Sequence, residues 1–253
     1  MKTPKLTLVG AGPGDADLIT LKGVKALQNA DAVLYDALAN PALLAHVPQN
    51  VPTIFVGKRK DHQAFSQEEI NDLIIGMAHK YGNVVRLKGG DPFIFGRGYE
   101  EIEAARAHSI ETEYIPGISS SVGVPGLEGI PVTHRGIAKS FYVVTATNSA
   151  GELTADIHAA TKLDATVVIL MGLGKLQEIV NVFEQAGKTD TGVAVIQNGS
   201  LPEHQIAVGT INNIVQIATE KNIGTPAVIV IGDTVKLHPA FQSAHEVVQT
   251  PVQ

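Results

Sequence analysis

The stretch that decides the fold is LTLVGAGPGDADLITLKG, residues 6–23, in which a short apolar run leads through closely spaced glycines into a helical pattern. A strand, a glycine turn and a helix in this order are typical of nucleotide-binding α/β proteins. The glycines follow the spacing G-x-G-P-G rather than G-x-G-x-x-G, and no Lys-Ser/Thr pair closes the turn as in a P-loop. Asp15 and Asp17 follow where a phosphate would need positive potential. The turn therefore points to a ligand that has an adenosine and no phosphate.

Composition excludes several classes of protein. The 253 residues can bury a substantial core as one or two α/β domains. No apolar run reaches the roughly 18 to 20 residues of a membrane span, and residues 6–9 are too short for the core of a signal peptide, so we expect a cytoplasmic protein. The chain has no cysteine and its nine histidines show no metal-ligand spacing, so we expect no metal site. The net charge of -6 argues against a general nucleic-acid binder.

The arginines are confined to one part of the chain, between residues 59 and 135. Because Arg binds carboxylates and phosphates bidentately, this clustering indicates a site for an anionic ligand, although a solvated face is the alternative. In RLKGGDPFIFGRG, residues 86–98, the cations Arg86, Lys88 and Arg97 bracket two glycines that let the backbone approach a ligand. We therefore expect this loop to belong to a binding site.

Short β-rich runs alternate with helical patterns along the chain, which predicts an α/β fold with largely parallel sheets. Residues 67–80, for example, place apolar side chains on one helical face. The stretch YIPGISSS, residues 114–121, interrupts the alternation, and strand-like runs restart after it. We therefore predict two α/β domains, residues 1–114 and residues 115–253. The loops after LVG, LKGG, LMG and QNG should face a common cleft, because ligands bind beyond the carboxyl ends of such strands.

Asp36 ends the run AVLYD about 20 residues beyond the glycine turn, where a dinucleotide-binding protein keeps the acid that binds a ribose. This position supports an NAD-dependent oxidoreductase. The glycine spacing and the second loop, with its Gly-Gly-Asp-Pro motif, speak against one. Both interpretations stay open on these residues alone.

The chain resembles the tetrapyrrole methylase family of S-adenosylmethionine-dependent enzymes. The similarity rests on VGAGPGDADLITLKG, YDAL, VGKR, QEEIN, VVRLKGGDPFIFGRG, PGISS, GIPVTHRG, LMGL and TPAVIVIG, which follow the family's order over nearly the whole chain. It implies two α/β domains in the tetrapyrrole methylase fold, a cofactor in the cleft between them, and a homodimer. S-adenosylmethionine has an adenosine and a positive sulfonium but no phosphate, which suits an acidic glycine turn without lysine.

The resemblance also implies roles for individual residues. Asp36 would accept a proton and Lys58 would donate one; a strand-end cap and a solvated cation are the structural alternatives. Contacts to the cofactor would come from Pro13, Gly89, Gly90, Asp91, Ile94, Ser119, Ser120, Met171, Gly199 and Ala227. For two of these, Met171 and Ala227, ordinary core packing is the alternative. Contacts to the acceptor's carboxylates would come from Arg59, Lys60, Arg97, His134 and Arg135, whose alternative is salt bridging between domains or subunits.

The activity implied by the resemblance is methylation of uroporphyrinogen III at C2 and then C7. The products would be precorrin-2, for sirohaem or cobalamin synthesis, and S-adenosylhomocysteine. This acceptor is a flexible ring rich in carboxylates, which would account for the clustered arginines. The ring attacks the sulfonium methyl in line, so the protein mainly positions two reactants. Methylation of a later corrin precursor at another carbon, and a non-catalytic sensor of either ligand, are the alternatives.

Overall fold

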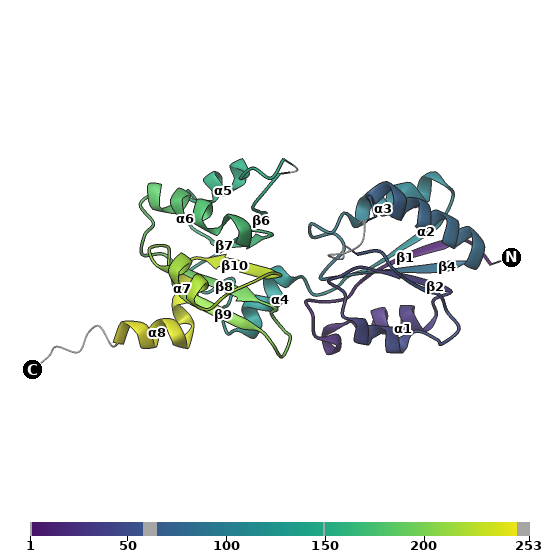
Figure 1. Ribbon diagram of the computed structural model, residues 1–253, viewed down its shortest axis with the longest axis horizontal. Helices are drawn as coiled ribbons and strands as arrows, with labels where there is room; N and C mark the ends of the chain where they lie inside the picture. The colour runs from purple at the N-terminus through teal and green to yellow at the C-terminus, as the bar shows by residue number, and fades with distance from the viewer. Residues whose placement is uncertain (1, 58–64, 149, 247–253) are drawn as a thin grey trace, which may run out of the picture. The chain divides into compact units, whose positions relative to one another are not determined.

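The computed structural model describes residues 2–57, 65–148 and 150–246. The chain divides into two compact units, Met1–Ser120 and Ser121–Gln253 (Figure 1). The division comes later than the boundary after residue 114 that the sequence pattern predicts. The reason is that β5, Glu111–Ile115, pairs with β1, and the N–H of Gly117 in the turn after β5 donates to Asp91 of the first unit.

The first unit holds a five-stranded sheet in the order β3-β2-β4-β1-β5, in which all neighbours are parallel. Its strands are β1 Lys5–Gly10, β2 Ala32–Tyr35, β3 Thr53–Phe55, β4 Asn83–Lys88 and β5 Glu111–Ile115. Its helices are α1 Leu21–Gln28, α2 Gln67–Tyr81 and α3 Gly98–Ala107, with the 3-10 helices η1 Ala16–Leu18 and η2 Pro41–His46. The predicted strand, glycine turn and helix at the start of the chain are therefore confirmed.

Alternate residues of the strands serve the two faces of this sheet. Leu6 and Leu8 of β1 pack with residues of α2 and α3, whereas Val9 packs with residues of α1. Figure 1 shows α2 and α3 on one side of the sheet and α1 on the other. The helix predicted over residues 67–80 is confirmed as α2, and it begins with a capping box between Ser66 and Glu69.

The second unit holds a sheet in the order β6-β7-β10-β8-β9. Its strands are β6 Phe141–Thr145, β7 Thr166–Leu170, β8 Gly192–Gln197, β9 Gln205–Thr210 and β10 Ala227–Ile231. Its α-helices are α4 Ser120–Leu127, which begins at the last residue of the first unit, α5 Ala155–Ala160, α6 Leu176–Gln185, α7 Ile214–Glu220 and α8 Pro239–Glu246. The 3-10 helices are η3 Leu173–Lys175 and η4 Asp233–Leu237.

The α/β fold class is confirmed, and parallel pairing predominates among the described strands. The second sheet differs from the prediction because only β6 and β7 are parallel there. The pairs β7–β10, β10–β8 and β8–β9 are antiparallel. Residues 198–204 alone join β8 to β9, and parallel neighbours need a crossover of about a dozen residues or more. The short connection therefore forces an antiparallel pair at this edge.

The second sheet is also covered on both faces. Ile169 and Ile229 belong to a cluster with α5, α6 and α7, whereas Val168 and Val230 belong to one with α4, η4 and α8. None of the helices in the described residues combines the length and the apolar character that crossing a membrane requires.

Three glycines bring the loops after β1, β4 and β5 into backbone contact at one edge of the first sheet. A Cβ on Gly10 would lie 2.5 Å from the Cα of Gly117 and 2.8 Å from the carbonyl oxygen of Gly90. The N–H of Gly90 donates to the carbonyl of Gly12 at 2.7 Å, and Gly12 donates back at 3.2 Å. Gly10 and Gly12 of the opening motif therefore allow the loops after β1, β4 and β5 to pack closely against one another.

We expect Gly10→Ala to lower the free energy of unfolding by about 1–3 kcal/mol, because the new methyl group must push backbone segments apart. Gly76→Ala is the matched control. It lies on α2, where a Cβ would meet nothing within 4 Å, so alanine should raise stability by about 0.5–1 kcal/mol through its helix propensity. Equilibrium urea unfolding of both variants measures the difference. Wild-type stability of Gly10→Ala would contradict the close packing.

Candidate functional site

The candidate site lies at the carboxyl edge of the first sheet. Parallel strands all deliver their carboxyl ends to one edge, where α/β proteins bind ligands. Among the described residues, the loops that follow β1, β2, β4 and β5 at this edge carry predicted site residues. These residues are Pro13 after β1, Asp36 after β2, Gly89, Gly90, Asp91 and Ile94 after β4, and Ser119 and Ser120 after β5.

The loop after β1 lacks the arrangement that binds a pyrophosphate. The side-chain amide of Asn40 donates to the carbonyl of Gly14 at 2.7 Å and holds the turn. Asp15 then caps η1 by accepting from the N–H of Asp17 at 2.9 Å, and α1 begins only at Leu21. A dinucleotide fold instead sets a helix N-terminus directly behind its glycines. Asp15 therefore caps the turn, and the negative charges of Asp15 and Asp17 make the loop unsuited to a phosphate.

Asp91 ties the loop after β4 to β5 and to the turn that follows it. Its buried carboxylate accepts from the N–H of Phe93 at 2.8 Å, from the hydroxyl of Tyr114 at 2.7 Å and from the N–H of Gly117 at 3.0 Å. Burial and the bond to Asp91 raise the pKa of Tyr114 to about 12, so the phenol stays a donor at neutral pH. The ring of Phe93 stacks on Tyr114 with 4.0 Å between centroids. Asp91 thus organises the loop in which a cofactor contact is predicted.

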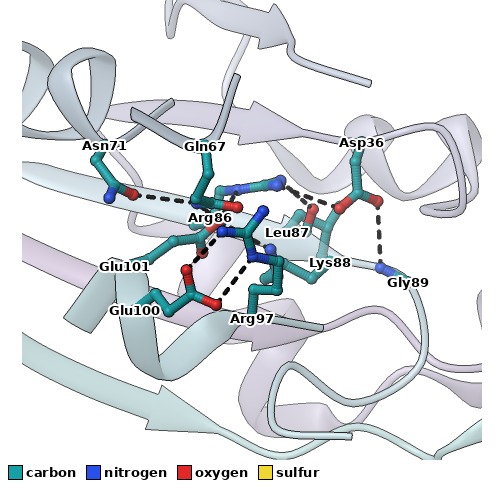
Figure 2. A network of polar contacts seen from close by, with 10 residues as sticks. All are labelled: Asp36, Gln67, Asn71, Arg86, Leu87, Lys88, Gly89, Arg97, Glu100 and Glu101. Carbon is teal, nitrogen blue, oxygen red and sulfur yellow. Dashed lines mark hydrogen bonds and ion pairs between the residues drawn. The ribbon is translucent and has the colours of Figure 1, made fainter. Parts of the chain in front are cut away.

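Figure 2 includes a charged network of four side chains: Asp36, Arg86, Lys88 and Glu101. Asp36 is the most exposed of the four. Its Oδ2 lies 3.2 Å from Nη2 of Arg86, and its Oδ1 accepts from the N–H of Gly89 at 3.4 Å. Nε of Arg86 and Nζ of Lys88 donate to Oε1 of Glu101 at 3.2 Å and 2.8 Å. The Asp36 side chain is 25% exposed and that of Glu101 is fully buried. Asp36, the predicted proton acceptor, is therefore the residue through which this network is accessible to solvent.

Arg86 and Lys88 are paired with acidic side chains of the first unit, whereas their position beside the glycines indicated a site for an anionic ligand. They are two residues apart on β4, so both side chains project from the face of the sheet that α3 covers. Both are buried and paired with Glu101. Burial and the charge of Arg86 lower the pKa of Lys88, while Glu101 and Asp36 act in the opposite direction.

Glu101 and Tyr114 are site residues that sequence reasoning missed. Glu101 lies on the buried face of α3 with Ile102 and Ala105, and an acid at such a position requires cationic partners. The signal in the sequence that could have predicted this acid is the pair Arg86 and Lys88, two cations at alternate positions of a buried strand. Tyr114 carried no comparable signal, because a strand-end tyrosine is common and its contact with Asp91 spans 23 positions of the chain.

The predicted acceptor-binding residues are distributed over both units. Arg97 is the N-cap residue of α3 and has a left-handed backbone, and its Nε and Nη2 donate to Oε1 and Oε2 of Glu100 at 2.9 and 2.6 Å. Hydrogen bonding to Glu100 raises the pKa of Arg97. His134 and Arg135 are exposed in a turn of the second unit. Three further basic residues with predicted roles lie outside the described residues: Lys58, Arg59 and Lys60.

The remaining predicted cofactor contacts share one edge of the second sheet. The strand register sets Met171, after β7, and Gly199, after β8, on either side of Ala227, the first residue of β10. Met171 is 61% exposed and has a φ of 56°, and Asn198 and Ser200 beside Gly199 are also left-handed. Such strain in non-glycine residues concentrates at functional sites. Exposure excludes core packing for Met171, whereas Ala227 packs partly against the core.

The residues at the first edge fit a cofactor with an adenosine and a sulfonium. A Cβ on Gly90 would have only the backbone nitrogen of Ser120 near it, at 3.8 Å, so the glycine leaves room beside the start of α4. Leu38, in contact with Gly89, and Ile94 expose apolar surface, and Asp36 adds a carboxylate. Among the described residues, no group of three His, Asp or Glu side chains is placed to hold a metal ion.

Comparison with known proteins gives a consistent result. Residues 5–215 match the sequence model of the Tetrapyrrole (Corrin/Porphyrin) Methylases. A Uroporphyrinogen-III C-methyltransferase from Methanocaldococcus jannaschii is 45% identical over 93% of this chain and 98% of its own length. A Siroheme synthase from Neisseria meningitidis is 44% identical over 92% of this chain, which spans only 48% of that relative.

One solved structure extends this comparison to the fold. The crystal structure of a Uroporphyrin-III C-methyl transferase from Thermus thermophilus, complexed with S-adenyl homocysteine, superposes with a TM-score of 0.79. The two sequences are 32% identical, and the match covers 92% of this chain and 99% of that one. The chain therefore belongs to the tetrapyrrole methylase family.

Proposed function

We propose that this protein is an S-adenosylmethionine-dependent methyltransferase that methylates uroporphyrinogen III at C2 and C7 and so produces precorrin-2 for sirohaem or cobalamin synthesis. The observation that carries the proposal is the near full-length similarity to a Uroporphyrinogen-III C-methyltransferase. The intact glycine loops at the edge of the first sheet support it. A tetrapyrrole acceptor, a homodimeric assembly and a cytoplasmic location are part of the same proposal.

The cofactor, when bound, supplies an electrophilic methyl group on a positive sulfonium. The backbone of Gly89 and Gly90 and the apolar side chain of Ile94 would hold it at the first edge, and Met171 is also assigned to the cofactor. The other contacts we assign to it are Pro13, Asp91, Ser119, Ser120, Gly199 and Ala227. These residues orient the cofactor, and orientation is the main contribution a protein can make to an in-line displacement.

Asp36 is the residue we assign to proton removal from the methylated ring. Its carboxylate offers about four lone-pair sites, and contacts with Arg86 and Gly89 use two of them. The partly exposed carboxylate can therefore still accept a proton. Lys58 is the proposed proton donor. The acceptor's carboxylates would meet five basic side chains: Arg59, Lys60, Arg97, His134 and Arg135.

An NAD-dependent oxidoreductase is not favoured, because η1 separates the glycine turn from α1 and acids cap that turn. Methylation of a later corrin precursor remains the alternative within the family, since the described cofactor loops would serve either acceptor.

The direct test is incubation with S-adenosylmethionine and uroporphyrinogen III, followed by mass spectrometry of the tetrapyrrole. We expect a gain of two methyl groups. Isothermal titration with S-adenosylhomocysteine in the presence of a chelator should show binding without added metal. Binding of NAD without binding of S-adenosylhomocysteine would overturn the proposal, and methylation of only a later precursor would select the alternative.

Asp91→Asn tests how the loop after β4 supports the cofactor. Losing hydrogen bonds to a buried charge should lower the free energy of unfolding by about 1.5–3 kcal/mol and weaken S-adenosylhomocysteine binding. Tyr114→Phe removes only one of the three donors, so both effects should be smaller and in the same direction. Titration calorimetry and urea unfolding measure them. Unchanged cofactor affinity in Asp91→Asn would leave the residue with a purely structural role.

Arg97→Ala tests whether exposed cations receive the acceptor. Loss of one charged hydrogen bond should raise the KM for the acceptor by about tenfold, while affinity for S-adenosylhomocysteine stays constant. Higher salt should reduce the difference between wild type and variant, because salt screens exposed charges. Arg106→Ala is the matched control on the same helix, where the guanidinium contacts Thr112. Equal kinetics of both variants would remove Arg97 from the acceptor site.

A further inference from the structure

Glu101 is the buried centre of the network in Figure 2 and has no part in the function proposed so far. Its Oε1 accepts from Arg86, from Lys88 and, at 3.3 Å, from the side-chain amide of Gln67. Its Oε2 has no hydrogen-bond partner among the described residues. A buried carboxylate is costly unless it is paired, so its presence in an otherwise apolar helix face calls for a role.

Arg86 connects Glu101 to the proton acceptor. Its three guanidinium nitrogens donate to three separate acceptors: Nε to Glu101, Nη1 to the carbonyl of Leu87 at 3.1 Å, and Nη2 to Asp36. The guanidinium is planar and rigid. It therefore cannot rotate away from Glu101 without also moving the nitrogen that holds Asp36.

The charges of the network also depend on one another. Two buried cations, Arg86 and Lys88, face Glu101 directly, and Asp36 carries the second negative charge of the group. Without the charge of Glu101, both cations would have Asp36 as their only anionic partner in this network. Lys88 would then compete with Arg86 for it, and the orientation of the Asp36 carboxylate would change.

We propose that Glu101 is a positioning residue for the methyl-transfer reaction: it fixes Arg86, and Arg86 holds the Asp36 carboxylate at the edge of the sheet. The inference rests on the proposed function, in which Asp36 accepts the proton. The N–H of Gly89 binds the other oxygen of Asp36, so the same carboxylate is tied to a loop assigned to the cofactor. Glu101, which lies on α3, thereby aligns the proton acceptor with the cofactor loop.

The first test is Glu101→Gln, which keeps the shape of the side chain and removes its charge. We expect kcat to fall by about 10- to 100-fold, the range that a misplacement of roughly 1 Å can produce. The KM values and the affinity for S-adenosylhomocysteine, measured by titration calorimetry, should stay close to wild type. Glu103→Gln, an exposed acid on the same helix, is the control and should leave kcat unchanged.

A double-mutant cycle with Asp36→Asn separates positioning from a structural effect. If Glu101 acts through Asp36, Glu101→Gln should lower kcat little further in the Asp36→Asn background, because residues that act as a unit are not additive. Additive losses, or an unchanged kcat in Glu101→Gln, would overturn the inference. Wild-type kcat in Asp36→Asn would instead overturn the role proposed for Asp36.

Arg86→Lys keeps the inference testable if Glu101→Gln does not fold. Lysine retains the charge but cannot donate in a rigid fork to Glu101 and Asp36 together. We therefore expect the same loss of kcat with unchanged KM, and the same lack of additivity with Asp36→Asn. A crystal structure of either variant should show the Asp36 carboxylate displaced, and an undisplaced carboxylate would count against the inference.

Discussion

The close approach of three glycines is the constraint on which the first unit depends. Gly10 and Gly117 lie so close to each other and to the carbonyl oxygen of Gly90 that neither of the two could carry a side chain. This contact brings the loops after β1, β4 and β5 to one point at the carboxyl edge of a parallel sheet. Asp91 then holds the second and third loops together through its bonds to Tyr114 and the N–H of Gly117. The candidate cofactor residues are thus positioned by backbone packing before any side chain contacts a ligand.

Strand β4 leads into one of these loops and also carries the two buried cations of the charged network. Its residues Val85 and Leu87 face the core beside α1, and its residues Arg86 and Lys88 face the helices on the other side. Burying two cations beside a sheet is unfavourable unless they are paired, and Glu101 of α3 supplies the pairing. Since Arg86 also contacts Asp36, the stability of the helix layer and the geometry of the proposed proton acceptor depend on the same group of charges.

The backbone beside the candidate residues of the second unit is strained. Its candidate residues lie at one edge of a mixed sheet, and the backbone there adopts left-handed conformations at Met171, Asn198 and Ser200. Each such conformation costs of order 1–3 kcal/mol and persists only where surrounding structure enforces it. At Gly199, Val124 of α4 fills the space where a side chain would be. The loop after β4 in the first unit combines both features, with glycines at its start and a left-handed backbone at Phe95 and Arg97.

The sequence by itself determined the elements and the family, whereas the tertiary structure decided which charges are available. Apolar periodicity is a local property, so the runs around residues 6–10 and 67–80 predicted β1 and α2, and the motifs predicted the loops that carry the candidate residues. Pairing direction and burial are not local. The antiparallel pairing of β8 with β9 follows from a short connection, and the pairing of Arg86 and Lys88 with Glu101 depends on a residue of another element. Sequence can show that a cation stands beside a glycine loop, but the face from which it projects depends on how the strand is buried.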